Sequence, residues 1–180
     1  MSIVGIKELL IRVKEDKLFE DLSERELTNP EGTGFDLRVG EIYKLTSGGF
    51  LGVENRETSN TELVVKYENN KNNSIIIKPN EYYLIKTIEK INNPKDLAPH
   101  FKHRSNLFRS GVVVHTAHCG QGYQGNLLFG IENRGKYDFK LEMGARVIHV
   151  VFHKIEGEGT EYRGQWQGGR ISTHGMERQV

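Results

Sequence analysis

The chain of 180 residues contains 25 lysines and arginines against 24 aspartates and glutamates, which gives a formal net charge of +1. This balance excludes a strong net field that would draw the protein to nucleic acid or to an anionic membrane. The single cysteine, Cys119, excludes an internal disulfide and the multi-cysteine motif with which zinc deaminases hold their metal.

The length predicts one domain, and its first element is a helix within residues 3–19. Ile6, Leu9, Leu10 and Val13 follow the spacing of a single helical face, and charged residues occupy the positions between them. This amphipathic pattern predicts that one side of the helix packs against the rest of the domain.

After the helix the pattern changes to short runs rich in β-branched and aromatic residues, separated by Gly, Asn and Pro. The predicted strands cover residues 41–45, 62–66, 74–78, 81–91, 112–115, 126–132, 139–142 and 146–155. Many short strands favour an all-β sandwich, jelly roll or barrel over a parallel sheet. The polar segments 52–60 and 156–180 contain few aliphatic residues, and we expect both to be flexible.

The segment from His103 to Gly111 concentrates side-chain donors, because it holds two arginines, two serines and an asparagine. Guanidinium forks and hydroxyl groups are suited to binding phosphate oxygens. A solvated polar turn would have a similar composition, so composition alone leaves both interpretations open.

This segment resembles the Arg-Ser-Ser-Leu-x-Arg signature of dCTP deaminases, which is related to the Arg-Ser-Gly-Leu-Ala signature of dUTPases. The resemblance implies that Arg104 and Ser105 contact phosphate and that Arg109 lies beside the reacting base. Asn106 stands where the family has serine or glycine, and it still offers hydrogen bonds to a substrate.

Two segments upstream and downstream extend the resemblance. Residues 32–40, Gly-Thr-Gly-Phe-Asp-Leu-Arg-Val-Gly, resemble the opening motif of both enzymes, which implies that Asp36 supports the phosphate and Mg²⁺ region indirectly. Residues 122–133 resemble the hairpin of the base and sugar pocket, which implies that Tyr123 forms an aromatic floor under the deoxyribose.

The last two matching segments lie nearer the C-terminus. Residues 144–152 resemble the family strand Gly-x-Arg-Ile-x-Gln-Leu-x-Phe, with His149 at the glutamine position. Residues 161–169 resemble the deaminase tail pattern Tyr-x-Gly-x-Tyr-Gln-Gly, which implies that Tyr162 and Gln167 contact bound nucleotide.

The motifs occur in the family order between about residue 5 and residue 173. They imply a dUTPase-like distorted jelly roll or β-barrel in residues 1–155, with an N-terminal helix and with a glycine-rich tail, 156–180, that closes over the site. They also imply a cytoplasmic homotrimer that binds a pyrimidine deoxynucleoside triphosphate with Mg²⁺. The sequence contains neither an apolar run long enough to span a membrane nor a signal-peptide pattern, which is consistent with the expected cytoplasmic location.

The implied activity is dCTP deamination to dUTP in nucleotide metabolism, and the N-terminal helix and tail favour it. The alternatives are a dUTP diphosphatase, a bifunctional dCTP deaminase and dUTPase, and an inactive nucleotide-binding or regulatory homologue. An unrelated β-sandwich interaction module would leave the ordered motifs unexplained.

Both family chemistries require a carboxylate that activates water. By the resemblance, the dUTPase aspartate falls at Gly120 and the deaminase glutamate falls at Gly130. Glu132 shares the strand face of Gly130 and is our candidate for the missing group; the alternative is that it is a solvated or ion-paired residue at a strand end.

Three histidines, His115, His118 and His149, are alternative bases, because imidazole titrates near neutral pH. His115, His118 and Cys119 also resemble a metal cluster. A zinc site normally needs a well-spaced third and fourth ligand, so packing or hydrogen bonding of these histidines is the preferred interpretation.

Overall fold

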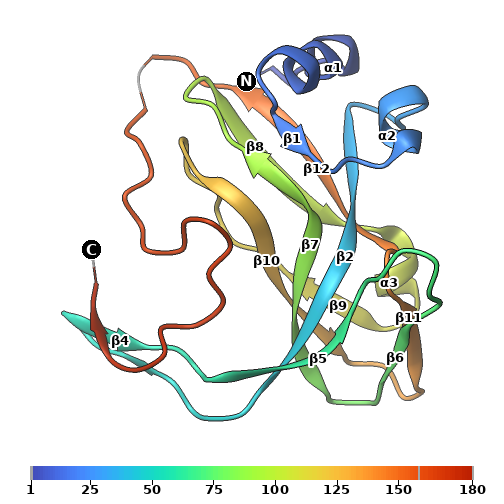
Figure 1. Cartoon of the computed structure of the whole chain (residues 1–180), viewed down its shortest axis with the longest axis vertical. Coiled ribbons are helices and arrows are strands. Elements are labelled where there is room, and N and C mark those ends of the chain that lie inside the picture. The colour runs from blue at the N-terminus through green and yellow to red at the C-terminus, as the bar shows by residue number, and fades with distance from the viewer. Residues whose placement is uncertain (1, 158, 180) are drawn as a thin grey trace.

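The computed structural model describes residues 2–157 and 159–179, and it is an antiparallel all-β fold (Figure 1). The helices are α1 (Ile6–Glu15), α2 (Glu24–Thr28) and α3 (Ser105–Arg109). The strands are β1 (Phe19–Glu20), β2 (Gly34–Leu45), β3 (Phe50–Leu51), β4 (Asn55–Glu57), β5 (Thr61–Lys66), β6 (Ser74–Ile77), β7 (Tyr82–Asn92), β8 (Leu97–His103), β9 (Val112–His115), β10 (Gln124–Asn133), β11 (Phe139–Glu142), β12 (Arg146–Lys154) and β13 (Glu177–Arg178).

The main sheet has the order β8-β12-β2-β7-β10-β9, with β1 paired to β7 and β5 paired to β2. Strongly twisted long strands such as β2, β7 and β10 wrap this sheet into a nearly closed barrel (Figure 1). Two small sheets, β11-β6 and β13-β4-β3, complete the fold. The all-β class that the sequence predicts is thereby confirmed.

The core lies inside the barrel, where alternate residues of the long strands are buried. Phe35 and Phe152 are fully buried on β2 and β12, and the ring of Phe19 packs edge-on against both at 5.9 and 6.0 Å between ring centroids. Edge-on packing of this kind adds to the stabilisation from burial of apolar area. Leu9 of α1 is also fully buried, so the helix covers one end of the barrel (Figure 1).

The sequence patterns missed β8, whose residues include Pro99. This strand lies at one end of the main sheet and pairs only with β12 among its described neighbours. A proline is tolerated at such an edge because its missing N–H breaks no ladder on the open side. Helix α1 is shorter than the predicted helical segment 3–19. It ends at Glu15, because Lys17, two residues later, adopts a positive φ of 53°.

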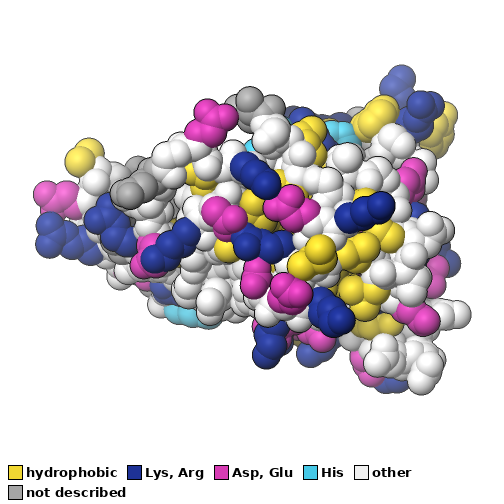
Figure 2. Space-filling view, turned by 90° about the horizontal axis from the view of Figure 1, so that it is seen from above, with side chains coloured by type: hydrophobic (Ala, Val, Ile, Leu, Met, Phe, Trp, Pro, Cys, Tyr) yellow, Lys and Arg dark blue, Asp and Glu magenta, His cyan; other side chains and the backbone are white. Residues whose placement is uncertain are grey.

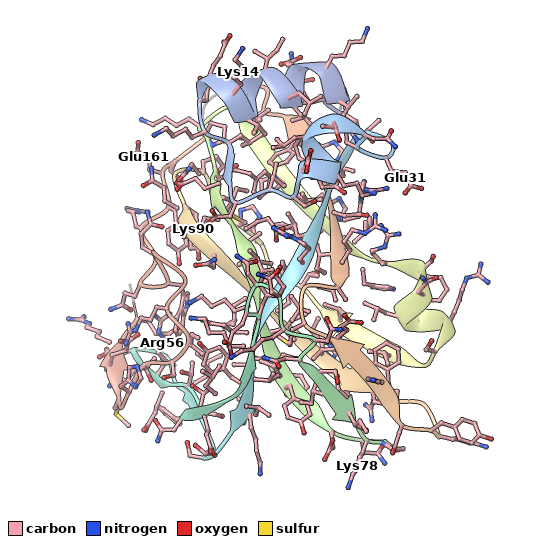
Figure 3. All side chains as sticks on the ribbon, turned by 45° about the vertical axis from the view of Figure 1, so that its right-hand side comes forward. Lys14, Glu31, Arg56, Lys78, Lys90 and Glu161 are labelled. Atoms are coloured by element: carbon pink, nitrogen blue, oxygen red, sulfur yellow. The ribbon has the colours of Figure 1, made fainter. Side chains whose placement is uncertain are left out.

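The segments 52–60 and 159–179 lie against each other (Figure 1). Arg56 of β4 donates two hydrogen bonds to the carboxylate of Glu177 on β13, and Arg170 binds the same carboxylate at 2.8 Å. The ring of Trp166 packs against both guanidiniums, at 4.7 Å from Arg56 and 5.5 Å from Arg170. Figure 3 shows Arg56 beside the tail. This network gives the tail a defined path along the barrel.

Positive and negative side chains are interspersed on the face shown in Figure 2, with hydrophobic side chains between them. No helix in the described part of the chain is long and apolar enough to cross a membrane.

Candidate functional site

A cavity of about 400 Å³ lies between the barrel wall and the C-terminal tail. Strands β7 and β10, the loop after β9 and the tail all contribute to its wall. Its aromatic and polar lining residues are Thr58, Ser59, Tyr82, Phe101, His118, Phe129, Tyr123, Tyr162, Trp166 and Arg170. A concave, mostly apolar site with a few polar groups is the usual form of a small-molecule pocket.

Tyr123 is fixed at the floor of the cavity by the hairpin that precedes β10. Its hydroxyl donates to the carbonyl of Asn126 at 2.6 Å, and its ring meets that of Tyr162 edge-on at 5.4 Å. Gly125, with φ +140°, lets the tail backbone approach, since a Cβ there would lie 2.6 Å from the carbonyl carbon of Gly168. Burial raises the pKa of Tyr123 to about 12, so the phenol is neutral at physiological pH.

The two glycines at the family carboxylate positions both face tyrosine rings. A Cβ on Gly130 would overlap the hydroxyl of Tyr82 and lie 2.8 Å from its ring carbon Cζ. A Cβ on Gly120 would lie 3.1 Å from Cδ2 of Tyr162. Aromatic side chains from β7 and from the tail therefore fill the space where the carboxylates would stand.

Glu132 lies at the end of β10, opposite Tyr82 on β7. One carboxylate oxygen accepts from Nε of Arg134 at 3.1 Å, and the other lies 3.3 Å from Nε2 of His115. Glu132 is not among the residues that line the cavity. Its observed contacts are those of an ion-paired residue at a strand end.

A separate polar cluster surrounds the buried carboxylate of Asp36 on β2. Arg104 donates to it, Nη1 of Arg146 lies 2.9 Å from Oδ2, and Nδ1 of His149 lies 2.9 Å from Oδ1. The backbone N–H of Asp36 donates to Oε2 of Glu26 at 2.9 Å. The cluster thus unites two of the matching motifs, at β2 and at the start of α3, with the strand β12.

Burial lowers the pKa of His149, and the nearby Arg104 lowers it further, against an opposing effect of Glu26 and Glu31. His149 is therefore neutral at neutral pH. A neutral imidazole can hold the arginine cluster in place through Nδ1 without adding charge to it.

The segment 104–109 consists of Arg104, which is the N-cap residue, and the short helix α3, which is anchored by the buried Leu107. Ser105, Asn106 and Arg109 are exposed on this helix, and the guanidinium of Arg109 packs against the ring of Phe108 at 5.9 Å. These three side chains are free to meet a ligand that approaches the surface. They lie outside the residues that line the cavity of this protomer.

Gln167 connects the tail to the hairpin of Tyr123. Its Nε2 donates to the carbonyl of Gly122 at 3.0 Å, and its Oε1 accepts from the N–H of Gln124 at 3.0 Å. The structure therefore brings Tyr123 and Tyr162 together in the cavity wall and places Gln167 outside it, against the hairpin of Tyr123. It places the Asp36 cluster and Glu132 outside the cavity wall.

The structure also adds residues that the sequence patterns missed, namely Tyr82, Trp166 and Arg170 in the cavity wall. Trp166 lies in the tail motif and Arg170 directly follows it, so this motif could have indicated both residues as part of the site. Tyr82 offered none, because its position over Gly130 depends on how β7 and β10 pair.

Within residues 2–157 and 159–179, no three His, Cys, Asp or Glu side chains gather to hold a metal ion. Cys119 is buried, and burial raises the pKa of its thiol to about 12. Thiolate is the form that binds metal, so this cysteine is a poor ligand. Both oxygens of Asp36 are already engaged, Oδ2 by two arginines and Oδ1 by His149, which does not fit direct coordination of Mg²⁺.

Comparison with solved structures places the barrel among the dUTPase-like folds. A dCTP deaminase from Agrobacterium tumefaciens superposes with a TM-score of 0.62 at 14% identity, over 83% of this chain and 46% of that longer chain. A dUTPase from Staphylococcus bacteriophage 80alpha gives a TM-score of 0.51 at 16% identity, over 80% of this chain and 85% of that one. The dUTPase-like fold is thereby confirmed.

Residues 4–155 match the family model described as dCTP deaminase-like, and the chain belongs to that family. A dCTP deaminase of Pyrococcus furiosus is 32% identical over 158 residues, which are 87% of this chain and 88% of the relative. A relative in Methanothermobacter thermautotrophicus, named as a deoxyuridine 5'-triphosphate nucleotidohydrolase, is 32% identical over 84% of this chain and 93% of its own length.

Proposed function

We propose that the protein is a pyrimidine deoxynucleoside triphosphate hydrolase of the dCTP deaminase type. The observation behind this proposal is the cavity of about 400 Å³ between Tyr123 and Tyr162, closed by the tail, in a member of the dCTP deaminase-like family. The base and deoxyribose would occupy this cavity, and the ring of Tyr123 would lie under the sugar. The ring of Tyr123 in the cavity wall supports this, because an apolar ring under the sugar disfavours a 2'-hydroxyl.

The triphosphate would bind the cationic groups around α3. Arg104 uses part of its guanidinium fork on Asp36, and its other N–H groups remain able to donate to phosphate oxygens. Ser105, Asn106 and Arg109 are exposed beside it. Mg²⁺ would arrive with the triphosphate and neutralise its charge, while Asp36 would position the arginines rather than coordinate the ion.

The cavity and α3 belong to different parts of one protomer, so we propose that a neighbouring copy completes each site in a homotrimer. Apolar side chains on two outer strands support such an assembly. Leu63 and Val64 of β5 and Ile76 of β6 are each about half exposed. Apolar residues at these positions gain stability when a second copy covers them.

The reaction to test first is loss of the 4-amino group of dCTP, in which water adds to ring carbon 4 and ammonia leaves. Cleavage of dUTP to dUMP and diphosphate is the second. Either reaction needs a base for water, and Glu132 is the carboxylate that shares a strand face with Gly130. To act, it must exchange its contacts with Arg134 and His115 for a water molecule.

Nucleotide binding without turnover is the second candidate function. The tyrosines at Gly120 and Gly130 favour it, because a neutral phenol is a poor base for water. In that case the protein would act as a regulatory binder with the family pocket.

The deciding experiment is incubation of the purified protein with Mg²⁺ and each of dCTP, dUTP and dTTP, followed by chromatography of the products. Calorimetric titration of the same nucleotides measures binding. Appearance of dUTP or dUMP supports the hydrolase, and binding without any product supports the regulatory function. Absence of both binding and turnover for all three nucleotides would overturn both candidates.

A further inference from the structure

Asn93, the first residue after β7, is buried in the turn that leads to β8, with only 2% of its surface exposed. Its side-chain Nδ2 donates to the carbonyl of Gly120 at 2.8 Å and to that of Cys119 at 3.4 Å. Its backbone N–H donates to the carbonyl of Tyr123 at 2.8 Å, and its own carbonyl accepts from the N–H of Gly122 at 2.8 Å. One buried residue therefore makes four hydrogen bonds to a single loop.

This loop, residues 119–123, is attached to the barrel through Asn93. Within residues 2–157 and 159–179, every hydrogen bond between the loop backbone and the barrel involves Asn93. The orientation of the amide is fixed as well, because exchange of Nδ2 and Oδ1 would turn an oxygen toward two carbonyl oxygens. The position of the loop relative to the barrel therefore depends on this one side chain and its backbone.

The same loop shapes the cavity on two sides. Three of its residues, Cys119, Gly120 and Tyr123, line the cavity directly. The loop also holds the tail, because the carbonyl of Gln121 accepts from the N–H of Tyr162 at 2.6 Å. The ring of Tyr162 meets that of Tyr123 edge-on at 5.4 Å between ring centroids. A shift of the loop would thus move both tyrosines and change the shape of the cavity.

Asn93 itself does not line the cavity. Its Oδ1 has no hydrogen-bond partner among the described residues, so burial of the amide carries a penalty that its two donated bonds offset. The carbonyl of Gly120 also keeps a second donor, the N–H of Tyr123 at 3.2 Å. The stability of the fold therefore depends little on this amide, whereas the position of the loop depends on it.

We propose that Asn93 is a positioning residue of the binding cavity. Its side-chain amide fixes the loop of residues 119–123, and with it the rings of Tyr123 and Tyr162, in the arrangement that binds a ligand.

The first test needs no nucleotide, because Cys119, the single cysteine of the chain, lies in the loop and is 6% exposed. Burial raises the pKa of its thiol to about 12, so labelling by N-ethylmaleimide reports opening of the loop. Asn93→Ala removes only the side-chain bonds. Asn93→Ser, which also cannot donate from an amide, is a second variant with the same expected result should the alanine variant be unstable.

The matched control is Asn92→Ala. The Nδ2 of Asn92 donates to the carbonyl of Lys17 at 2.7 Å and to the carboxylate of Glu20 at 3.1 Å. This variant also loses two side-chain hydrogen bonds, but neither of them reaches the loop. Thermal unfolding of all variants separates a general loss of stability from a shift of the loop.

Asn93→Ala should label about 3- to 10-fold faster than the wild type, the range expected for the loss of one net hydrogen bond. Asn92→Ala should label at the wild-type rate. The second test rests on the proposed function and uses calorimetric titration with dCTP and dUTP in the presence of Mg²⁺. Asn93→Ala should weaken binding of the nucleotide that the wild type binds by about the same factor, and Asn92→Ala should not.

The inference is overturned if Asn93→Ala labels at the wild-type rate, or if Asn92→Ala accelerates labelling equally. It is also overturned if faster labelling leaves the nucleotide affinity unchanged. Failure of the wild type to bind either nucleotide would instead overturn the proposed function, and the labelling rates would still decide whether Asn93 holds the loop.

Discussion

Thr58 and Thr173 bind each other in both directions, because the backbone N–H of each donates to the hydroxyl of the other at 3.0 Å. Thr173 is buried, and Thr58 lines the cavity. The pair fastens the tail to the segment that follows β4.

Thr173→Val keeps the shape of the side chain and removes its hydroxyl. We expect the loss of one hydrogen bond and an unsatisfied N–H at Thr58 to cost about 1–3 kcal/mol of local stability. Amides in residues 170–179 should then exchange with deuterium faster than in the wild type. Thr160→Val, at an exposed tail position, is the control. Unchanged exchange in the Thr173 variant would show that other contacts hold the tail.

Arg104→Ala should weaken binding of a triphosphate far more than binding of the monophosphate, since the lost donors are charge-assisted and aimed at phosphate oxygens. It should also lower the free energy of unfolding, because buried Asp36 loses its contact with Arg104, and its remaining partners are Arg146, His149 and the more distant Arg25. Calorimetry and thermal unfolding separate the two effects. Equal affinity losses for both nucleotides would assign Arg104 a purely structural role.

Glu132→Gln keeps size and hydrogen bonding while removing the basic oxygen. If Glu132 activates water, turnover should fall about 10²-fold or more with little change in nucleotide affinity. Arg134→Ala, which frees the carboxylate from its ion pair, is a control that should not lower turnover. Full activity of the glutamine variant would refute the assignment and make His115 the leading base.

The protein should lose stability on acidification partly through His149. Its folded pKa lies below the ordinary value of 6.5, so below about pH 6.5 the unfolded chain binds more protons than the native one. This contribution is fully present above that pH and is lost as the pH falls toward the folded pKa. His149→Asn should therefore reduce the difference in unfolding free energy between pH 7.5 and pH 5.5. Urea denaturation at both pH values measures it.

Light scattering of the purified protein should give about three times the chain mass of 20.6 kDa. Replacing Leu63 and Val64 together by Ser should shift the protein toward the monomer, because these half-exposed side chains would lose a covered apolar surface. A wild-type monomer at micromolar concentration would remove the case for a shared site.

The sequence predicted the strands well where alternation and turn residues agree. The prediction for residues 112–115 matches β9, and that for 139–142 matches β11. It missed β8, because Pro99 reads as a break unless the strand is known to lie at a sheet edge. The short helices α2 and α3 were missed as well, since five residues are too few to show a helical period.

Motif order located Tyr123 and Tyr162, and the structure places both in the cavity wall. Motif order did not reveal that the carboxylate of Asp36 binds Arg104, Arg146 and His149. These contacts depend on the pairing of β2 with β12. Nor did motif order reveal Tyr82. A diagonal contact between strands depends on register, and register is set by the whole sheet rather than by a local pattern.

The contact between Tyr82 and Gly130 constrains how this chain can evolve. A glutamate introduced at position 130 alone would overlap the phenol, so the first step toward a deaminase carboxylate carries a steric penalty. Shortening Tyr82 first would open the space but remove an aromatic side chain from the cavity wall. Each of the two substitutions, at position 82 or at position 130, is therefore unfavourable alone, whereas the two together need not be. The effects of the two positions are thus strongly non-additive. A change to a carboxylate at position 130 is therefore most favourable once position 82 holds a smaller residue.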